Sequence, residues 1–307
     1  MSMTRTAEKK MFNMVVCVKQ VPAGAQAKLD PVTKTLIRSA GSSILNPYDA
    51  FAVEAALQIR DRLAAAAETS EAPAAPQAAE APAPAQTAEA PGISCSVTAL
   101  SMGVPSVEKM LKDLIARGVD EGILLTDRAF AGADTIATSR SLSLGVRQIE
   151  YRRGSVSLII CGHMAVDGDT AQIGPELAET LKLPHVSNVL KIVEVDPENS
   201  FAVVECIAAE GKQTLRVQLP ALITVSKDIN VLRLPSISGI RRAEHQDVRV
   251  LGAAELNADP AILGKRGSAT QVVRTFTPDF EAKAERVTGT PKEVAVKIRD
   301  IIGRLIG

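Results

Sequence analysis

The segment from Leu158 to Gly174, LIICGHMAVDGDTAQIG, combines residue types in an order that suits a phosphate-binding turn. The apolar run 158–161 is typical of a buried parallel strand, and it stops at Gly162. A small acidic turn follows, and a helix pattern begins at Ile173. A strand that leads through such a turn into a helix presents free backbone amides and the positive end of the helix dipole. The pattern predicts an anion cradle, with helix packing alone as the alternative.

A second segment with possible ligand chemistry is DRAFAGADTIATS, residues 127–139. Small residues around Gly132 permit the close approach of a large planar ligand or of its pyrophosphate. Hydroxyl donors follow at a helix start, namely Thr135, Thr138 and Ser139. The alternative interpretation is an ordinary capped helix after a tight loop.

The composition limits the classes of partner and cofactor. The 35 basic and 35 acidic residues cancel, so nothing indicates nucleic acid or an anionic membrane as a partner. The first residues contain neither a signal-peptide pattern nor an apolar run of membrane-spanning length, so we expect a cytoplasmic protein. The four cysteines lie far apart without a CxxC motif and the three histidines show no metal-ligand spacing. We therefore expect no metal site.

Strands and helices alternate through the first two thirds of the chain. Apolar patterns predict strands at 12–18, 93–100, 122–126 and 158–161, separated by helices at 48–63, at 107–118 and at 133–149. This order predicts an α/β fold with a doubly wound parallel sheet. Beyond Pro184, polar turns separate further strands, which we interpret as an antiparallel extension: 186–193, 201–207, 214–217 and 222–225.

Two regions depart from this pattern. Residues 64–91 are almost entirely Ala, Pro, Glu, Gln, Thr and Ser, so we expect a mobile insertion that buries little apolar surface. From Leu251 to Glu281 little periodicity survives, which indicates either disorder or an arm that packs on something else. The chain then ends in a predicted helix, with a capping box at Thr290 and Glu293 and one apolar stripe.

Five motifs in this order resemble the β (small) subunit of electron-transfer flavoproteins. Beside the glycine turn stand VVCVKQVP (15–22), NPYDAFAVEAAL (46–57), TALSMGVPSVEKML (98–111) and LPALITVSKDIN (219–230). The resemblance implies an adenine-nucleotide α-hydrolase-like domain over residues 12–232. It also implies that residues 233–307 form a partner-recognition loop, an extended arm and a C-terminal helix that pack on an α subunit.

The family's nucleotide site maps onto the end of the first strand, the loop above the base and ribose, the end of the second strand and the glycine turn. The matching positions are Cys17, Asn46, Pro47, Tyr48, Asp49, Met102, Gly162, His163, Met164, Ala165, Val166, Asp167, Gly168, Asp169, Thr170, Ala171, Gln172 and Ile173. A carboxylate repels a phosphate, so we expect Asp167 and Asp169 to cap the helix or to bond ribose hydroxyls.

The segments 127–139 and 264–277 resemble the electron-bifurcating branch of the family, whose β subunit holds FAD in place of AMP. That likeness makes Gly132, Thr135, Thr138 and Ser139 cofactor-binding residues. It implies that NADH donates electrons, that ferredoxin or flavodoxin takes one of them, and that the α-subunit FAD passes the other to an acyl-CoA or related dehydrogenase. The chain would be an oxidoreductase only within that complex, because the flavin supplies the redox chemistry.

Two alternatives remain open from the sequence. The chain could be an AMP-binding β subunit that supports a single-flavin electron carrier, or a non-redox adenine-nucleotide-binding module of the same fold. In either flavoprotein reading, we expect a partner-recognition loop centred on Ile237 and including Ile240. The residues after it, AEHQD (243–247), depart from the lysine-rich run of classical members of the family, which leaves the partner dehydrogenase open.

Overall fold

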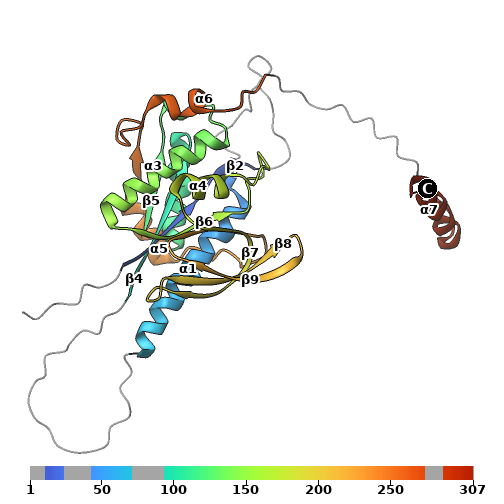
Figure 1. Ribbon diagram of the computed structural model, residues 1–307, viewed down its shortest axis with the longest axis horizontal. Helices are drawn as coiled ribbons and strands as arrows, with labels where there is room; N and C mark the ends of the chain where they lie inside the picture. The colour runs from blue at the N-terminus through green and yellow to red at the C-terminus, as the bar shows by residue number, and fades with distance from the viewer. Residues whose placement is uncertain (1–10, 24–42, 71–92, 274–285, 307) are drawn as a thin grey trace, which may run out of the picture. The chain divides into compact units, whose positions relative to one another are not determined.

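The computed structural model describes residues 11–23, 43–70, 93–273 and 286–306, with backbone alone for 67–70 (Figure 1). Within these residues, one nine-stranded sheet has the order β11-β5-β4-β1-β6-β10-β7-β8-β9. Its strands are β1 (Met11–Cys17), β4 (Ser94–Met102), β5 (Glu121–Leu125), β6 (Val156–Gly162), β7 (His185–Asp196), β8 (Phe201–Ala208), β9 (Gly211–Gln218), β10 (Ala221–Val225) and β11 (Arg249–Leu251). A separate ribbon pairs β2 (Gln20–Pro22) with β3 (Ser43–Leu45).

Helices cover both faces of this sheet. The α-helices are α1 (Pro47–Ser70), α2 (Glu108–Arg117), α3 (Thr135–Arg153), α4 (Ile173–Leu181), α5 (Ile237–His245), α6 (Gly264–Gly267) and α7 (Pro291–Ile306). The 3₁₀ helices are η1 (Pro105–Val107), η2 (Arg128–Phe130) and η3 (Pro260–Ile262). One core cluster joins α1, α2 and α5 to the sheet, and a second joins α3 and α4 to its other face. The predicted doubly wound α/β fold is confirmed.

The parallel pairing places β1 at the centre. It pairs in parallel with β4 on one side and with β6 on the other, so that Cys17 lies opposite Leu100 and Cys161. Chain direction is therefore shared across the middle of the sheet, and the carboxyl ends of β1, β4 and β6 meet at one edge. Ligands of open α/β sheets bind at this edge.

The antiparallel extension is smaller than expected. Strands β7, β8 and β9 pair antiparallel with one another, as predicted. The last expected strand, β10, instead inserts between β6 and β7 and is parallel to both. Its five residues are all buried, as in a central strand, and such a continuous apolar run carries no information on strand direction.

The first helix is longer than the sequence pattern indicated. It continues through Ala64 to Ser70, seven residues into the segment expected to be a mobile insertion. The run Ala64–Ala67 explains the extension, because alanine has the highest helix propensity and needs no buried face to favour a helix. The rest of the predicted insertion, from residue 71 onward, lies outside the described residues.

Residues 233–271 belong to the compact unit that carries the sheet, which corrects the expectation of an arm beginning at Leu251. Strand β11 pairs in parallel with β5 and extends the sheet by one strand. Leu251, Leu256 and Leu263 are buried in the core cluster shared with α3 and α4. A three-residue strand and short turns show no periodicity, and this is why the pattern did not reveal them.

A second unit begins at Val272 and contains α7. The Thr290 amide donates to the Glu293 carboxylate at 2.8 Å, which is the predicted capping box. Within this unit Ile298, Ile302 and Leu305 are exposed. The helix therefore has an apolar stripe that the described residues of its own unit do not bury.

We predict that Leu263→Ala will destabilise the compact unit by about 2–4 kcal/mol, because the substitution deletes a side chain that is only 1% exposed. Urea unfolding of the purified protein provides the measurement. The matched control is Leu234→Ala, since Leu234 is 84% exposed and its truncation should change stability by less than about 0.5 kcal/mol. Equal effects of the two substitutions would contradict the placement of residues 251–263 in the core.

Candidate functional site

The carboxyl edge of the sheet gathers the predicted site residues from three strands. Cys17 ends β1, Met102 ends β4 and Gly162 ends β6. The Cys17 and Cys161 side chains are both buried, and their mutual hydrogen bond together with burial raises the pKa of the Cys161 thiol well above its ordinary value. These cysteines are therefore packing groups beneath the edge.

The loop before α1 is bound to the glycine turn through Asn46. This side chain is fully buried, and its Nδ2 donates to the Met164 carbonyl at 2.8 Å. The Val166 amide donates back to Asn46 Oδ1 at 3.2 Å. The side-chain amide of Asn46 thus donates through Nδ2 and accepts through Oδ1. As a result, the start of α1 and residues 164–166 form one rigid corner of the site.

Asp49 is a buried carboxyl group in the first turn of α1. Its Oδ2 accepts the Lys19 amide at 2.7 Å. Burial raises the pKa of Asp49 to about 7, although hydrogen bonds from Asn46, Lys19 and Gly162 act in the opposite direction. Near neutral pH both the protonated and the ionised form of this carboxyl group are therefore populated.

Gly162 provides the closest approach between the end of β6 and α1. A Cβ atom there would lie 2.5 Å from Asp49 Oδ1 and 2.6 Å from the Tyr48 carbonyl carbon. Only glycine leaves room for this contact. The next residue, His163, donates its backbone amide to Val225, and its ring meets the Tyr48 ring edge-on at 5.9 Å. His163 is thus a packed neighbour of the turn.

The two aspartates of the turn have different roles. Asp167 pairs with Lys19, with 2.7 Å between Oδ1 and Nζ. This pair neutralises the carboxylate that sequence reasoning regarded as unfavourable near a phosphate, so Asp167 neither caps α4 nor stays unpaired. Asp169 is exposed and has a positive φ of 56°.

The second half of the turn has backbone amides without an acceptor among the described residues. Among the described residues, none accepts a hydrogen bond from the backbone amides of Thr170–Gly174. Ala171 has a positive φ of 54° and Gln172 a right-handed helical backbone, an alternation that turns successive amides toward one point. The α4 dipole adds positive potential there. This part of the turn can bind the phosphate of a nucleotide.

The loop between β5 and α3 is placed next to this turn, but its hydroxyls are engaged within the protein. Gly132 has a φ of 72°, a backbone conformation that favours glycine. Thr135 Oγ1 donates to Glu176 Oε1 at 3.0 Å, and Ser139 Oγ lies 2.8 Å from the Thr135 carbonyl and 3.3 Å from Glu176 Oε2. The expectation that these hydroxyls are free donors is therefore wrong in this structure. Thr138 is half-buried on α3.

The predicted partner-recognition residues lie on α5, away from the carboxyl edge. Ile237 is 83% exposed and Ile240 is 45% exposed. The preceding segment is fixed to α1, because Arg233 Nε bonds the buried Glu54 carboxylate at 2.9 Å. Arg242 fixes α5 itself by donating to the Ile115 carbonyl at the end of α2. A rigid support thus presents exposed apolar side chains.

Sequence reasoning missed three residues near the site. Lys19 follows β1 and neutralises Asp167; a lone lysine after a strand carries no signal for that role. Glu176 on α4 pairs with Thr135 and Ser139 on α3. Its position shortly after the glycine turn could have indicated a helix-capping role, but not these two partners. The Ser101 hydroxyl, buried beside Met102, has no partner within the described part of the chain.

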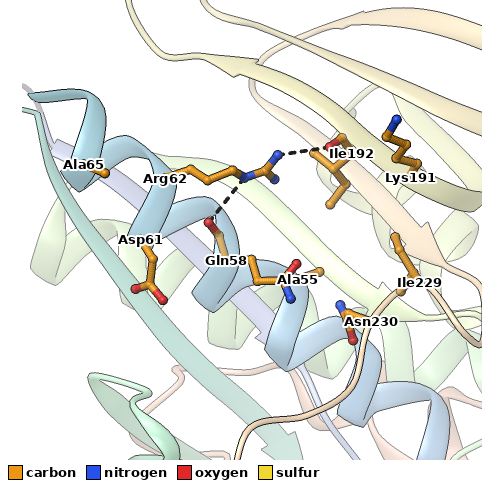
Figure 2. A pocket seen from close by; sticks show the side chains of 9 residues that line it. All are labelled: Ala55, Gln58, Asp61, Arg62, Ala65, Lys191, Ile192, Ile229 and Asn230. Atoms are coloured by element: carbon orange, nitrogen blue, oxygen red, sulfur yellow. Dashed lines mark hydrogen bonds between the residues drawn. The ribbon is translucent and has the colours of Figure 1, made fainter. Parts of the chain in front are cut away.

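A cavity of about 490 Å³ lies elsewhere, between α1, β7 and the residues after β10. Figure 2 shows Arg62 extending from α1 to the Ile192 carbonyl; Ile229 and Asn230 also line the cavity. No predicted site residue lines this cavity.

Two findings concern absences in the parts of the chain that are described. No group of three or more histidine, cysteine, aspartate or glutamate side chains is arranged to hold a metal ion. None of the described helices has the length and apolar character required to span a membrane.

Comparison with known proteins shows the family to which the chain belongs. A model of the electron transfer flavoprotein domain matches residues 67–256. The chain is 38% identical over 295 residues to the electron transfer flavoprotein subunit beta of Thermoanaerobacterium thermosaccharolyticum, covering 96% of this chain and 98% of that protein. The chain belongs to the electron transfer flavoprotein family.

Other relatives in the family have more specific names. The chain is 36% identical to the caffeyl-CoA reductase-Etf complex subunit CarD of Acetobacterium woodii, covering 96% of this chain and 97% of that protein. It is 37% identical to protein FixA of Azorhizobium caulinodans, covering 90% and 88% respectively. The resemblance seen in the motifs is thus confirmed, and the family places the chain in electron transport as a flavoprotein β subunit.

We predict that Gly162→Ala will destabilise the protein by about 1–3 kcal/mol, because the added methyl group collides with the first turn of α1. The matched control in the same turn is Gly168→Ala, since a Cβ there has no atom within 4 Å. Thermal or urea unfolding compares the two variants. If Gly162→Ala unfolds at the same midpoint as Gly168→Ala, the close approach of α1 to β6 is wrong.

We predict a pH dependence that Asp49→Asn removes. The folded-state pKa of Asp49, about 7, lies above the ordinary value, so the folded protein binds this proton more tightly than the unfolded chain does. Its contribution to stability is complete below about pH 4 and is lost as the pH rises through about 7, with a slope of at most about 1.4 kcal/mol per pH unit. Urea midpoints from pH 5 to 8 should therefore fall in the parent protein relative to Asp49→Asn. Parallel curves for the two proteins would contradict a raised pKa.

Proposed function

We propose that the chain is the β subunit of a heterodimeric electron transfer flavoprotein of the electron-bifurcating type and that it binds FAD at the carboxyl edge of its sheet. The Thr170–Gly174 amides would hold the phosphates, and the corner at Asn46, Tyr48 and Asp49 would adjoin the adenosine part. Bound there, FAD would accept electrons from NADH. The chain's own groups position the cofactor and balance charge around it.

The observation that carries this proposal is the contact between two distant segments. Residues 127–139 and 264–277 both resemble the bifurcating branch, and within the compact unit that carries the sheet, residues 129–134 contact residues 264–270. The Lys265 amide donates to the Ala131 carbonyl at 3.0 Å, and the Asp134 amide donates to Ser268 Oγ at 2.9 Å. A Cβ on Gly264 would lie 2.2 Å from the Ala129 carbonyl oxygen. The two segments form one support beside the anion cradle.

The partners follow from the family and from the names of relatives. A β subunit implies an α subunit, which in this proposal carries a second FAD. The name of CarD, a subunit of a reductase–Etf complex, supports a dehydrogenase or reductase of the acyl-CoA class as the partner that Ile237 and Ile240 contact. Ferredoxin or flavodoxin would take the second electron. We propose a cytoplasmic location for this complex.

An AMP-binding subunit is the second candidate. The cradle at Thr170–Gly174 would suit a single phosphate as well as a pyrophosphate, because its amides belong to one helix start. In that case the β5–α3 loop would have only a packing role, and the heterodimer would contain one flavin.

The two candidates differ in a directly countable quantity. We predict that the chain, purified with its α subunit, releases two FAD molecules per heterodimer on denaturation, measured by chromatography of the released nucleotides. One FAD and one AMP would establish the second candidate instead. A heterodimer without any nucleotide in the β subunit would contradict both.

A further inference from the structure

We propose that Glu176 is a positioning residue that sets the spacing between the two helix starts at the cofactor site. This inference rests on the proposed nucleotide-binding function, because the spacing matters only if a nucleotide lies at that edge. Glu176 does not belong to the turn; it lies in the first turn of α4, four residues after Gln172. It acts through the residues that it holds.

Glu176 joins the two helices with both of its carboxylate oxygens. Oε1 accepts from Thr135 Oγ1 at 3.0 Å, and Oε2 lies 3.3 Å from Ser139 Oγ. Thr135 is the first residue of α3, and Ser139 is one turn further along. Thr135 Oγ1 also lies 3.4 Å from Gln172 Oε1, at the end of the glycine turn. A single side chain thus connects the start of α3 to the start of α4.

The location also suits a carboxylate electrostatically. Negative side chains are stabilised at helix N-termini, and Glu176 is within one turn of two of them. Hydrogen bonds to a charged acceptor are about twice as strong as those between neutral groups. The bonds from α3 to the Glu176 carboxylate therefore hold the two helices together. As a result, the loop 127–134 and the cradle at Thr170–Gly174 keep a constant separation.

Its neighbour Glu179 provides a matched control on the same helix. Glu179 is exposed, and the one described residue that its carboxylate pairs with is Lys182, one turn away on the surface. Replacing Glu179 with alanine removes the same charge from α4 without touching α3. A difference between the two alanine variants therefore reports the connection and not the charge of the helix.

The experiment uses the heterodimer with the nucleotide that it carries after purification. The rate of nucleotide release is measured by rapid filtration in an excess of the same labelled nucleotide. We expect Glu176→Ala to release it about tenfold faster, because loss of a charged hydrogen-bond partner on this scale frees the two loops. Glu176→Gln, which retains an acceptor for Thr135, should stay within about threefold of the parent. Glu179→Ala should not change the rate.

A double variant separates positioning from direct contact. If Thr135 acts only through Glu176, then Thr135→Val combined with Glu176→Ala releases the nucleotide no faster than Glu176→Ala alone. If the increases in release rate of the two single variants multiply in the double variant, the Thr135 hydroxyl contacts the nucleotide itself. That result would overturn the inference. Urea unfolding of each variant monitors the fold. If Glu176→Ala is too unstable to purify, Glu176→Gln is compared with Thr135→Val. The inference then expects slower nucleotide release from Glu176→Gln than from Thr135→Val.

The outcomes distinguish this inference from the function on which it rests. A parent heterodimer that retains its nucleotide, together with a Glu176→Ala variant that releases it at the parent rate, overturns only the role of Glu176. A parent heterodimer with no nucleotide in the β subunit overturns both.

Discussion

The contact between the end of β6 and the first turn of α1 is the constraint on which the site depends. Because no side chain fits at Gly162, the start of α1 lies directly against the glycine turn, and Asn46 bonds both sides of that contact. The carboxyl group of Asp49 is enclosed as a result, and Lys19 is brought to Asp167. The remaining part of the turn, Thr170–Gly174, is left with amides that point to no acceptor in the described chain.

The helices on the two faces of the sheet support different parts of the molecule. On the α3–α4 face, Glu176 connects the starts of the two helices, and the residues around Gly264 lie against the loop before α3. On the other face, α1 and α2 hold α5 and its exposed Ile237 through Glu54–Arg233 and through Arg242. Cofactor binding and partner contact can therefore use separate surfaces supported by one sheet.

Much of the fold was predictable because apolar spacing reports burial. The strands at β1, β4, β5 and β6 and the helix from Ile173 to Leu181 follow from that spacing. The direction of β10 could not be predicted, because a fully apolar run is compatible with both a parallel and an antiparallel strand. Leu251 and Leu263 were missed because the elements that carry them are too short for periodicity. At the site, residue types predicted the cradle, whereas the hydroxyl partners of Thr135 and Ser139 depend on how α3 packs on α4, which no local pattern encodes.

The most direct test of the account is amide hydrogen exchange at the glycine turn of the heterodimer, with and without its nucleotide. The account predicts that binding slows exchange of the amides from Thr170 to Gly174, while the Val166 amide, already bonded to Asn46, changes little. Exchange that slows elsewhere and leaves Thr170–Gly174 unaffected would contradict the claim that these amides hold the phosphate.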